Sequence, residues 1–204
     1  MALIYPTYLP NIATYMVMVQ KNEVIFEVHD SYQKQTYRNR CYIYGANGKL
    51  SLNIPVHYSQ NNRQNTKAIK IDNSSKWQST HWKSIESAYK TSPFFEYYED
   101  DLVKLFSTPK TYLLDFNFEC IAAINSCLGY DMSESKSKQF TKTNSETDYR
   151  FLVNARQETS VKTPNYIQVF NEKHGFINNL SILDLLCNEG PNALNFLKNE
   201  PFTL

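Results

Sequence analysis

The side chains best suited to chemistry gather in the segment 30–40, DSYQKQTYRNR, which separates two apolar runs. Beside the carboxylate Asp30, it holds the cationic or hydrogen-bonding residues Lys34, Tyr37, Arg38, Asn39 and Arg40. Side chains alternate along an extended strand, which would put Arg38 and Arg40 on one face. Paired guanidinium groups bind carboxylate or phosphate, so the segment predicts a site for an anionic small molecule. The alternative is a solvated strand face whose arginines pair with nearby acids.

His81 is the second candidate, because histidine exchanges protons near neutral pH. It follows Trp77 by four residues, so both lie on one face of a predicted helix, and a histidine packed structurally against this tryptophan is the alternative. Asp30, at the end of an apolar run, is the other candidate acid or base. No histidine pair has metal-ligand spacing and no glycine-rich phosphate loop occurs, so we expect neither a metal nor a cofactor.

The elements that must position these residues indicate an α/β fold. An apolar run at 2–5, a helical run at 12–19 and a second apolar run at 24–28 have the order of a βαβ unit with parallel strands. Ligands of such units lie beyond the carboxyl ends of the strands, here 5–8 and 29–32. Tyr8 therefore joins the predicted binding residues.

A hairpin insertion and helices complete the predicted mixed sheet. Gly45-Ala46-Asn47-Gly48 predicts a turn between extended segments at 35–43 and 50–56. After an exposed polar loop at 59–66, a further extended segment is expected at 68–71. Three helices should follow, with these end signals: Ser74 or Ser75 as the cap of the first, Ser92 and Pro93 opening the second, and Gly129 ending a third that starts near Tyr112.

The chain divides into three predicted parts. Residues 1–130 form the α/β core, and the polar stretch 131–148 is a linker or mobile loop. Residues 149–204 form a C-terminal segment that docks on the core, because its predicted helix at 182–188, capped by Ser181, is too apolar to stay exposed. Further strands or docking segments are expected at 150–153 and 166–170.

Composition limits the partners. The 204 residues include 21 basic and 20 acidic side chains, a net charge of +1, so we expect no nucleic-acid partner. No apolar run approaches the ~20 residues of a membrane span, so we predict a cytoplasmic protein without membrane insertion, of open oligomeric state. The four cysteines are predicted to be buried reduced thiols, with a reactive Cys41 as the alternative.

Several ordered motifs together resemble one family. They are Tyr8-Leu9-Pro10, Tyr37-Arg38-Asn39-Arg40, Leu52-Asn53-Ile54-Pro55-Val56, Trp77 followed by His81-Trp82, Ser92-Pro93-Phe94-Phe95 and the C-terminal GFINNLSILDLL at 175–186. In these the chain resembles the WbqC-like family of bacterial proteins, over nearly its whole length apart from 131–148. Many members carry His-Gln-Pro where this chain has Ile4-Tyr5-Pro6.

The resemblance implies a role in surface-polysaccharide or O-antigen biosynthesis, with transfer of glycine or another acyl group to an amino sugar. Under this hypothesis the arginines hold a nucleotide-linked amino sugar, Tyr37 and Asn39 orient it, and His81 takes the amine proton. The alternative hypothesis is a non-catalytic ligand-binding or scaffold protein of the same kind of pathway. Whether the chain is an enzyme stays open at this point.

Overall fold

The predicted βαβ unit is present in the structure, a computed structural model that describes residues 1–21, 23–59, 64–142, 147–156, 161–201 and 203. It consists of β1 (Ala2–Ile4), α1 (Ile12–Gln20) and β2 (Val24–Phe26), and the two strands pair in parallel with Ala2 opposite Val24. Residues 12–19 of α1 are all buried, which explains why this helix is apolar on every side.

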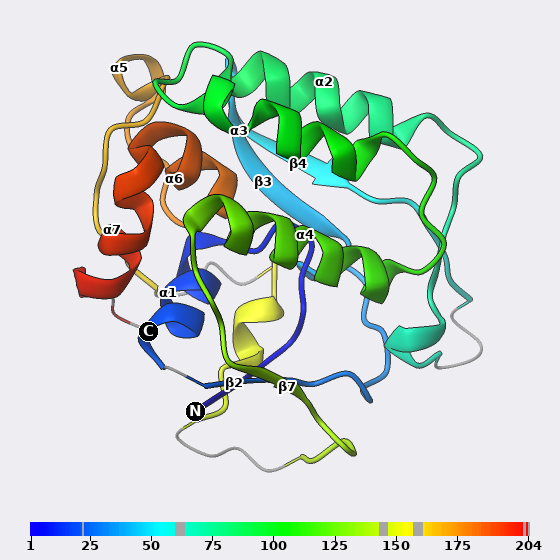
Figure 1. Cartoon of the computed structure of the whole chain (residues 1–204). Helices are drawn as coiled ribbons and strands as arrows, with labels where there is room; N and C mark the ends of the chain where they lie inside the picture. The colour runs from blue at the N-terminus through cyan, green and yellow to red at the C-terminus, as the bar shows by residue number, and fades with distance from the viewer. Residues whose placement is uncertain (22, 60–63, 143–146, 157–160, 202, 204) are drawn as a thin grey trace.

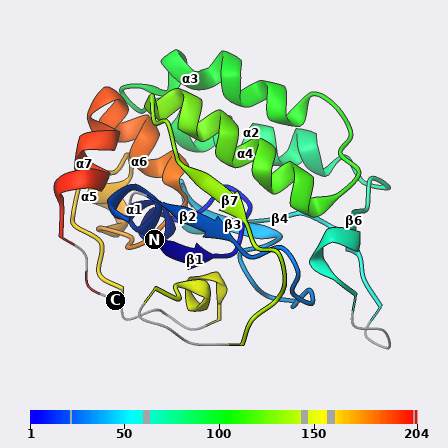
Figure 2. The ribbon, with the colours of Figure 1, turned by 60° about the horizontal axis from the view of Figure 1, so that its bottom comes forward.

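A third parallel strand lies inside the stretch predicted as a linker or mobile loop. β7 (Glu134–Lys136) pairs with β2, which gives the sheet order β1-β2-β7 (Figure 2). All three of its side chains are exposed, although Nζ of Lys136 lies 4.3 Å from the Phe118 ring centroid, so no apolar pattern could reveal this edge strand. Residues 143–146 of the stretch lie outside the described residues, and the division of the chain at 131 and 149 stays a prediction.

The predicted hairpin is confirmed as β3 (Arg40–Gly45) and β4 (Gly48–Asn53), with Gly48 at a φ of 97°. However, the strand starts at Arg40 rather than at residue 35, because Tyr37 and Arg38 form a turn. The predicted alternation that put Arg38 and Arg40 on one strand face is therefore wrong.

A second, shorter pair of antiparallel strands follows the hairpin. It consists of β5 (Val56–His57) and β6 (Lys70–Ile71), with η1 (Thr66–Ala68) between them. Part of the predicted exposed loop 59–66, residues 60–63, lies outside the described residues, and Thr66 at its end is buried.

Helices α2 (Trp77–Tyr89), α3 (Phe95–Leu102) and α4 (Leu113–Leu128) lie together over the hairpin, with η2 (Val103–Phe106) after α3 (Figure 1). Gly129, at a φ of 62°, ends α4 as predicted. The predicted starts of the other two are wrong: Lys76 precedes α2 without a side-chain cap, and Ser92 bonds the Tyr89 carbonyl instead of opening α3. Capping signals therefore marked the neighbourhood of each helix but not its first residue.

The C-terminal segment packs on the βαβ unit. Its elements are η3 (Arg150–Val153), α5 (Asn171–His174), α6 (Ile182–Glu189), η4 (Gly190–Asn192) and α7 (Ala193–Asn199). Ser181 caps α6 as predicted, and α6 and α7 pack against α1. Neither of the strands expected at 150–153 and 166–170 forms: the first is η3, which lies beside β1, and the second has no regular structure before α5.

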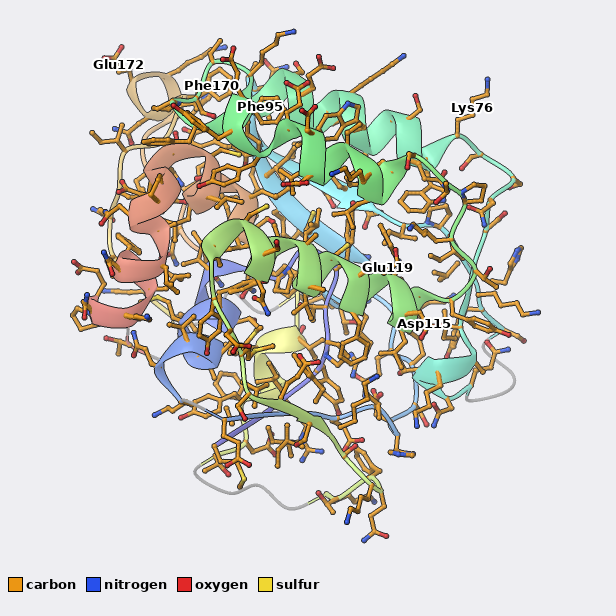
Figure 3. All side chains as sticks on the ribbon, viewed as in Figure 1. Lys76, Phe95, Asp115, Glu119, Phe170 and Glu172 are labelled. Atoms are coloured by element: carbon orange, nitrogen blue, oxygen red, sulfur yellow. The ribbon has the colours of Figure 1, made fainter. Side chains whose placement is uncertain are left out.

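The molecular periphery carries charged side chains, such as Lys76 before α2 and Glu172 in α5 (Figure 3). Across the described ranges, every helix is too short or too polar to cross a membrane.

Candidate functional site

A cleft of about 620 Å³ opens beyond the carboxyl ends of the parallel strands. Tyr5 follows β1 directly, residues 33–36 follow β2, and Phe140 and Lys142 follow β7. The segment after each strand of the sheet therefore contributes residues to the cleft wall. The remaining lining residues come from η3 and its flanks: Asp148, Arg150, Phe151, Val153, Asn154 and Arg156. Ligands of parallel sheets are expected at this place.

The cleft lining is cationic. The described residues that line it include Lys34, Lys142, Arg150 and Arg156 but a single carboxylate, Asp148. Asp148 is fully engaged by Arg150, whose Nε and Nη2 donate to its two oxygens at 2.9 and 2.6 Å. Burial acts to raise the pKa of Asp148, but the hydrogen bonds from Arg150 outweigh it and lower this pKa. The charges of the two lysines and Arg156 therefore have no matching carboxylate among the described lining residues, and they favour an anionic ligand.

Three aromatic rings complete the cleft wall. The Tyr5 ring lies against the guanidinium group of Arg38, 4.0 Å from the ring centroid to Cζ. Phe140 and Phe151 also line the cleft and leave 42% and 49% of their surfaces exposed. Exposed aromatic faces beside cations suit a ligand that combines a flat ring with phosphate or carboxylate groups.

Two of the predicted residues form a buried pair behind the wall. Arg38 and Asp30 are 1% and 4% exposed, and Nη2 of Arg38 lies 2.6 Å from Oδ2 of Asp30. Nη1 of Arg38 also donates to Oγ1 of Thr36 at 3.3 Å. Both Thr36 and Tyr5 line the cleft, so Arg38 supports the cleft wall from behind rather than standing in it.

The other predicted binding residues divide between the cleft and its surroundings. Lys34 lines the cleft, with Nζ 5.0 Å from the Tyr58 ring centroid. Tyr37 is 9% exposed and packs edge-on against Tyr42. Asn39 donates to the Ile54 carbonyl, and the half-buried Arg40 starts β3. None of these last three residues lines the cleft.

His81 and Tyr8 form a separate pair. The Tyr8 hydroxyl lies 2.9 Å from Nδ1 of His81, and both side chains are buried beside Trp77 and Phe116. Burial lowers the pKa of His81 to about 4, so the ring is neutral near pH 7. His81 lines a smaller hollow of about 300 Å³ with residues of β4 and α2, and it does not line the cleft.

The start of α1 is not available to an anion, although a βαβ unit often binds phosphate there. The Ile12 and Ala13 amides donate to Leu180 and Asn179 of the C-terminal segment, and those of Thr14 and Tyr15 donate to Asn11. All four amide groups of the first turn are thus satisfied within the protein. Anion recognition in this fold must come from side chains.

Burial also distinguishes between buried reduced cysteines and a reactive Cys41. Cys41 is 1% exposed, and burial raises its pKa well above the ordinary value, which argues against a reactive thiolate. Cys120 and Cys187 are buried in the same way, and Cys127 is half-buried.

The sequence analysis named the segments that hold Tyr5 and Thr36 without choosing these residues, and it missed Phe140, Arg150 and Arg156. Phe140 is an apolar residue in polar surroundings, and that isolation was the available signal for it. Arg150 carried no such signal, since its place depends on the way residues 147–149 run along β1.

Comparisons with known proteins agree with the motifs. The model of the WbqC-like protein family matches residues 5–163, so the chain belongs to this family. The chain is also similar to a Mycobacterium tuberculosis protein named uncharacterized protein Rv1507c, at 25% identity over 97% of this chain and 96% of that protein. No solved structure matches the chain significantly.

Proposed function

We propose that this member of the WbqC-like family binds a nucleotide-linked amino sugar in the cleft beyond β1, β2 and β7. The observation that carries the proposal is the lining itself, where, among the described residues, three cations without a matching carboxylate stand beside partly exposed aromatic rings. Lys34, Lys142 and Arg156 supply the charge for a diphosphate, and Phe140 and Phe151 supply faces for a base. The volume of about 620 Å³ suits a ligand of this size.

The reaction we propose is the transfer of glycine or another acyl group to the sugar amine during surface-polysaccharide biosynthesis. The amine nitrogen attacks the carbonyl carbon of an activated acyl ester or thioester. A C–N bond forms, the bond to the alcohol or thiol leaving group breaks, and the amine proton passes to a base or to the leaving group. Such a reaction needs binding and orientation but no enzyme nucleophile.

The second candidate function is ligand binding without catalysis. It is favoured by the cleft lining, which contains no histidine or cysteine among the described residues and whose carboxylate, Asp148, is held by Arg150. The proposed base, His81, lies in the separate hollow with its Nδ1 engaged by Tyr8. Incubation with an amino sugar nucleotide and activated glycine separates the two, because only the transferase yields a product heavier by one glycyl group.

Calorimetry tests the binding itself, with UDP-glucose, dTDP-glucose, the two free diphosphates and glucose as ligands. We expect the diphosphates to bind and glucose not to bind. Replacing Lys34 or Lys142 by Gln should weaken diphosphate binding about tenfold, the scale of one charged hydrogen bond. The matched control is Lys90→Gln, an exposed lysine of an i,i+4 pair at the end of α2. Absence of diphosphate binding, or equal binding by all variants, would refute the proposal.

A further inference from the structure

Buried polar atoms without a hydrogen-bond partner concentrate behind the wall of the cleft. Eleven such side-chain atoms occur in the part of the chain that the structure describes. Nine of them belong to segments that meet at the Asp30–Arg38 pair: Thr7, Glu27, Asp30, Arg38, Asn39, Arg40, Gln64, Thr66 and Asn117. Buried polar groups are normally satisfied by protein, water or ligand, so such a concentration marks a place that can hold further hydrogen-bonding groups.

Backbone and side-chain hydrogen bonds tie these segments together. The Thr66 amide donates to the Asp30 carbonyl at 3.0 Å. The Asn117 side chain donates to the carbonyls of Arg38 and Pro6, at 2.9 and 3.2 Å. Thr66 and Asn117, which each carry one of these atoms, therefore lie against the buried Asp30–Arg38 pair. All four residues are at most 4% exposed.

The set of atoms is rich in acceptors. Five of the nine are carboxylate or amide oxygens, which only accept hydrogen bonds: Glu27 Oε2, Asp30 Oδ1, Asn39 Oδ1, Gln64 Oε1 and Asn117 Oδ1. Two more are threonine hydroxyls, which can also accept, and the other two are arginine Nε donors. The group that best matches this set is one with several N–H bonds, and a primary ammonium group has three.

Tyr5 stands between this acceptor set and the cleft. Its ring lines the cleft and covers Arg38. Burial raises the pKa of Tyr5, the charge of Asp30 raises it further, and the charge of Arg38 lowers it. The guanidinium carbons of Arg38 and Arg150 lie 4.0 and 6.0 Å from the ring centroid. Among the described residues the Tyr5 hydroxyl has no hydrogen-bond partner, so turning the ring aside would break these two ring contacts but no hydrogen bond.

We propose that the place behind Tyr5 in the cleft wall, at Asp30, is a subsite for a primary amino group of the ligand. Oδ1 of Asp30 and Oγ1 of Thr66 are its acceptors. Turning of the Tyr5 ring admits the amine, while the cations at the cleft rim hold the anionic end. The subsite selects ligands that are anionic at one end and carry an amine at the other. The inference rests on the proposed function and adds to it the recognition of the reacting group.

Three ligands with one scaffold test the subsite by calorimetry: UDP-glucosamine, UDP-glucose and UDP-N-acetylglucosamine. They carry an amine, a hydroxyl or an acylated amine at the same carbon. We expect the amine to bind about tenfold more tightly than either of the others, the scale of a hydrogen bond to a charged group. Equal binding of all three would overturn the subsite and leave the proposed function standing, whereas binding of none would contradict the proposed function.

Two variants locate the amine. Asp30→Asn should abolish the preference for UDP-glucosamine over UDP-glucose. Thr66→Val keeps the Asp30–Arg38 pair and the size of the side chain, and it should reduce the preference, so the test does not depend on whether Asp30→Asn folds. Asp101→Asn, in an exposed ion pair of α3, is the control. A preference that survives Asp30→Asn in folded protein, or Thr66→Val, would refute the assignment of these acceptors.

Discussion

Arg38→Met is the substitution that most directly tests how the buried pair supports the cleft. The change keeps an unbranched side chain of similar length but removes the guanidinium group. Asp30, at 4% exposure, then loses the partner that lies 2.6 Å from its Oδ2. Thr36 loses its bond from Nη1, and the Tyr5 ring loses the cation that lies 4.0 Å from its centroid.

The expected cost follows from burial. Removing one partner of a buried ion pair leaves an uncompensated charge and lowers the free energy of unfolding by about 3 to 5 kcal/mol. With a urea m-value near the upper end for small proteins, this corresponds to a midpoint lower by about 1 to 2 M. The double variant Asp30→Asn with Arg38→Met leaves no buried charge at this place, so its loss should be smaller than the sum of the two single losses.

Urea unfolding followed by circular dichroism measures these changes. The control is Lys104→Met, which breaks a Lys104–Asp101 pair of nearly the same length, 2.7 Å, at 71% and 61% exposure. Solvent screens the exposed pair, so the control should leave the urea midpoint unchanged. Equal midpoints for Arg38→Met and Lys104→Met, or fully additive losses in the double variant, would refute the reasoning from burial.

Two buried groups predict opposite effects of pH on stability. His81 has a pKa of about 4 in the folded protein against 6.5 in the unfolded chain, so protonation favours the unfolded chain. The free energy of unfolding should therefore fall by roughly 2 to 3 kcal/mol from pH 7 to 4.5, and His81→Gln should remove this loss. Burial raises the pKa of Asp184 from 3.8 to about 6, so its protonated form stabilises the fold at low pH. The free energy of unfolding should therefore fall by roughly 2 kcal/mol from pH 4.5 to 7, and Asp184→Asn should remove this loss. Urea midpoints at the two pH values measure both, and a variant whose pH dependence equals that of the wild type would contradict the corresponding assignment.

Periodicity predicted the parts of the fold that depend on apolar burial. The βαβ unit and α4 each bury a continuous apolar set, and each was predicted with its main boundaries. The hairpin was predicted from its turn residues, and its first strand starts later than expected. β7 was not predicted, because a strand of three exposed residues pairs mainly through the backbone of its neighbour and buries no apolar side chain. The residues of such a strand do not by themselves indicate that it pairs.

The site was predicted less completely, for a related reason. The sequence pattern offered two interpretations of Arg38, a ligand-binding residue or part of a solvated strand face. In the first, Arg38→Lys would weaken binding and barely affect folding. The turn at Tyr37 and Arg38 instead directs Arg38 to Asp30, eight residues away, and the structure therefore predicts a loss of stability. Lys34, only four residues from Arg38, remains in the cleft. Which polar residue of a segment faces solvent depends on one turn that its composition does not specify.

Docking of the C-terminal segment explains why this fold would recognise an anion with side chains. Leu180 and Asn179 accept the first two amide hydrogens of α1, and the Ser181 hydroxyl bonds the Leu9 carbonyl at 3.0 Å. The helix start that usually attracts phosphate is thereby used to hold the two ends of the chain together. Positive charge for a ligand must then come from residues at the mouth of the cleft, such as Lys34, Lys142 and Arg156. Because lysine and arginine at a cleft mouth are solvated, binding of a diphosphate by this protein should weaken steeply as ionic strength rises.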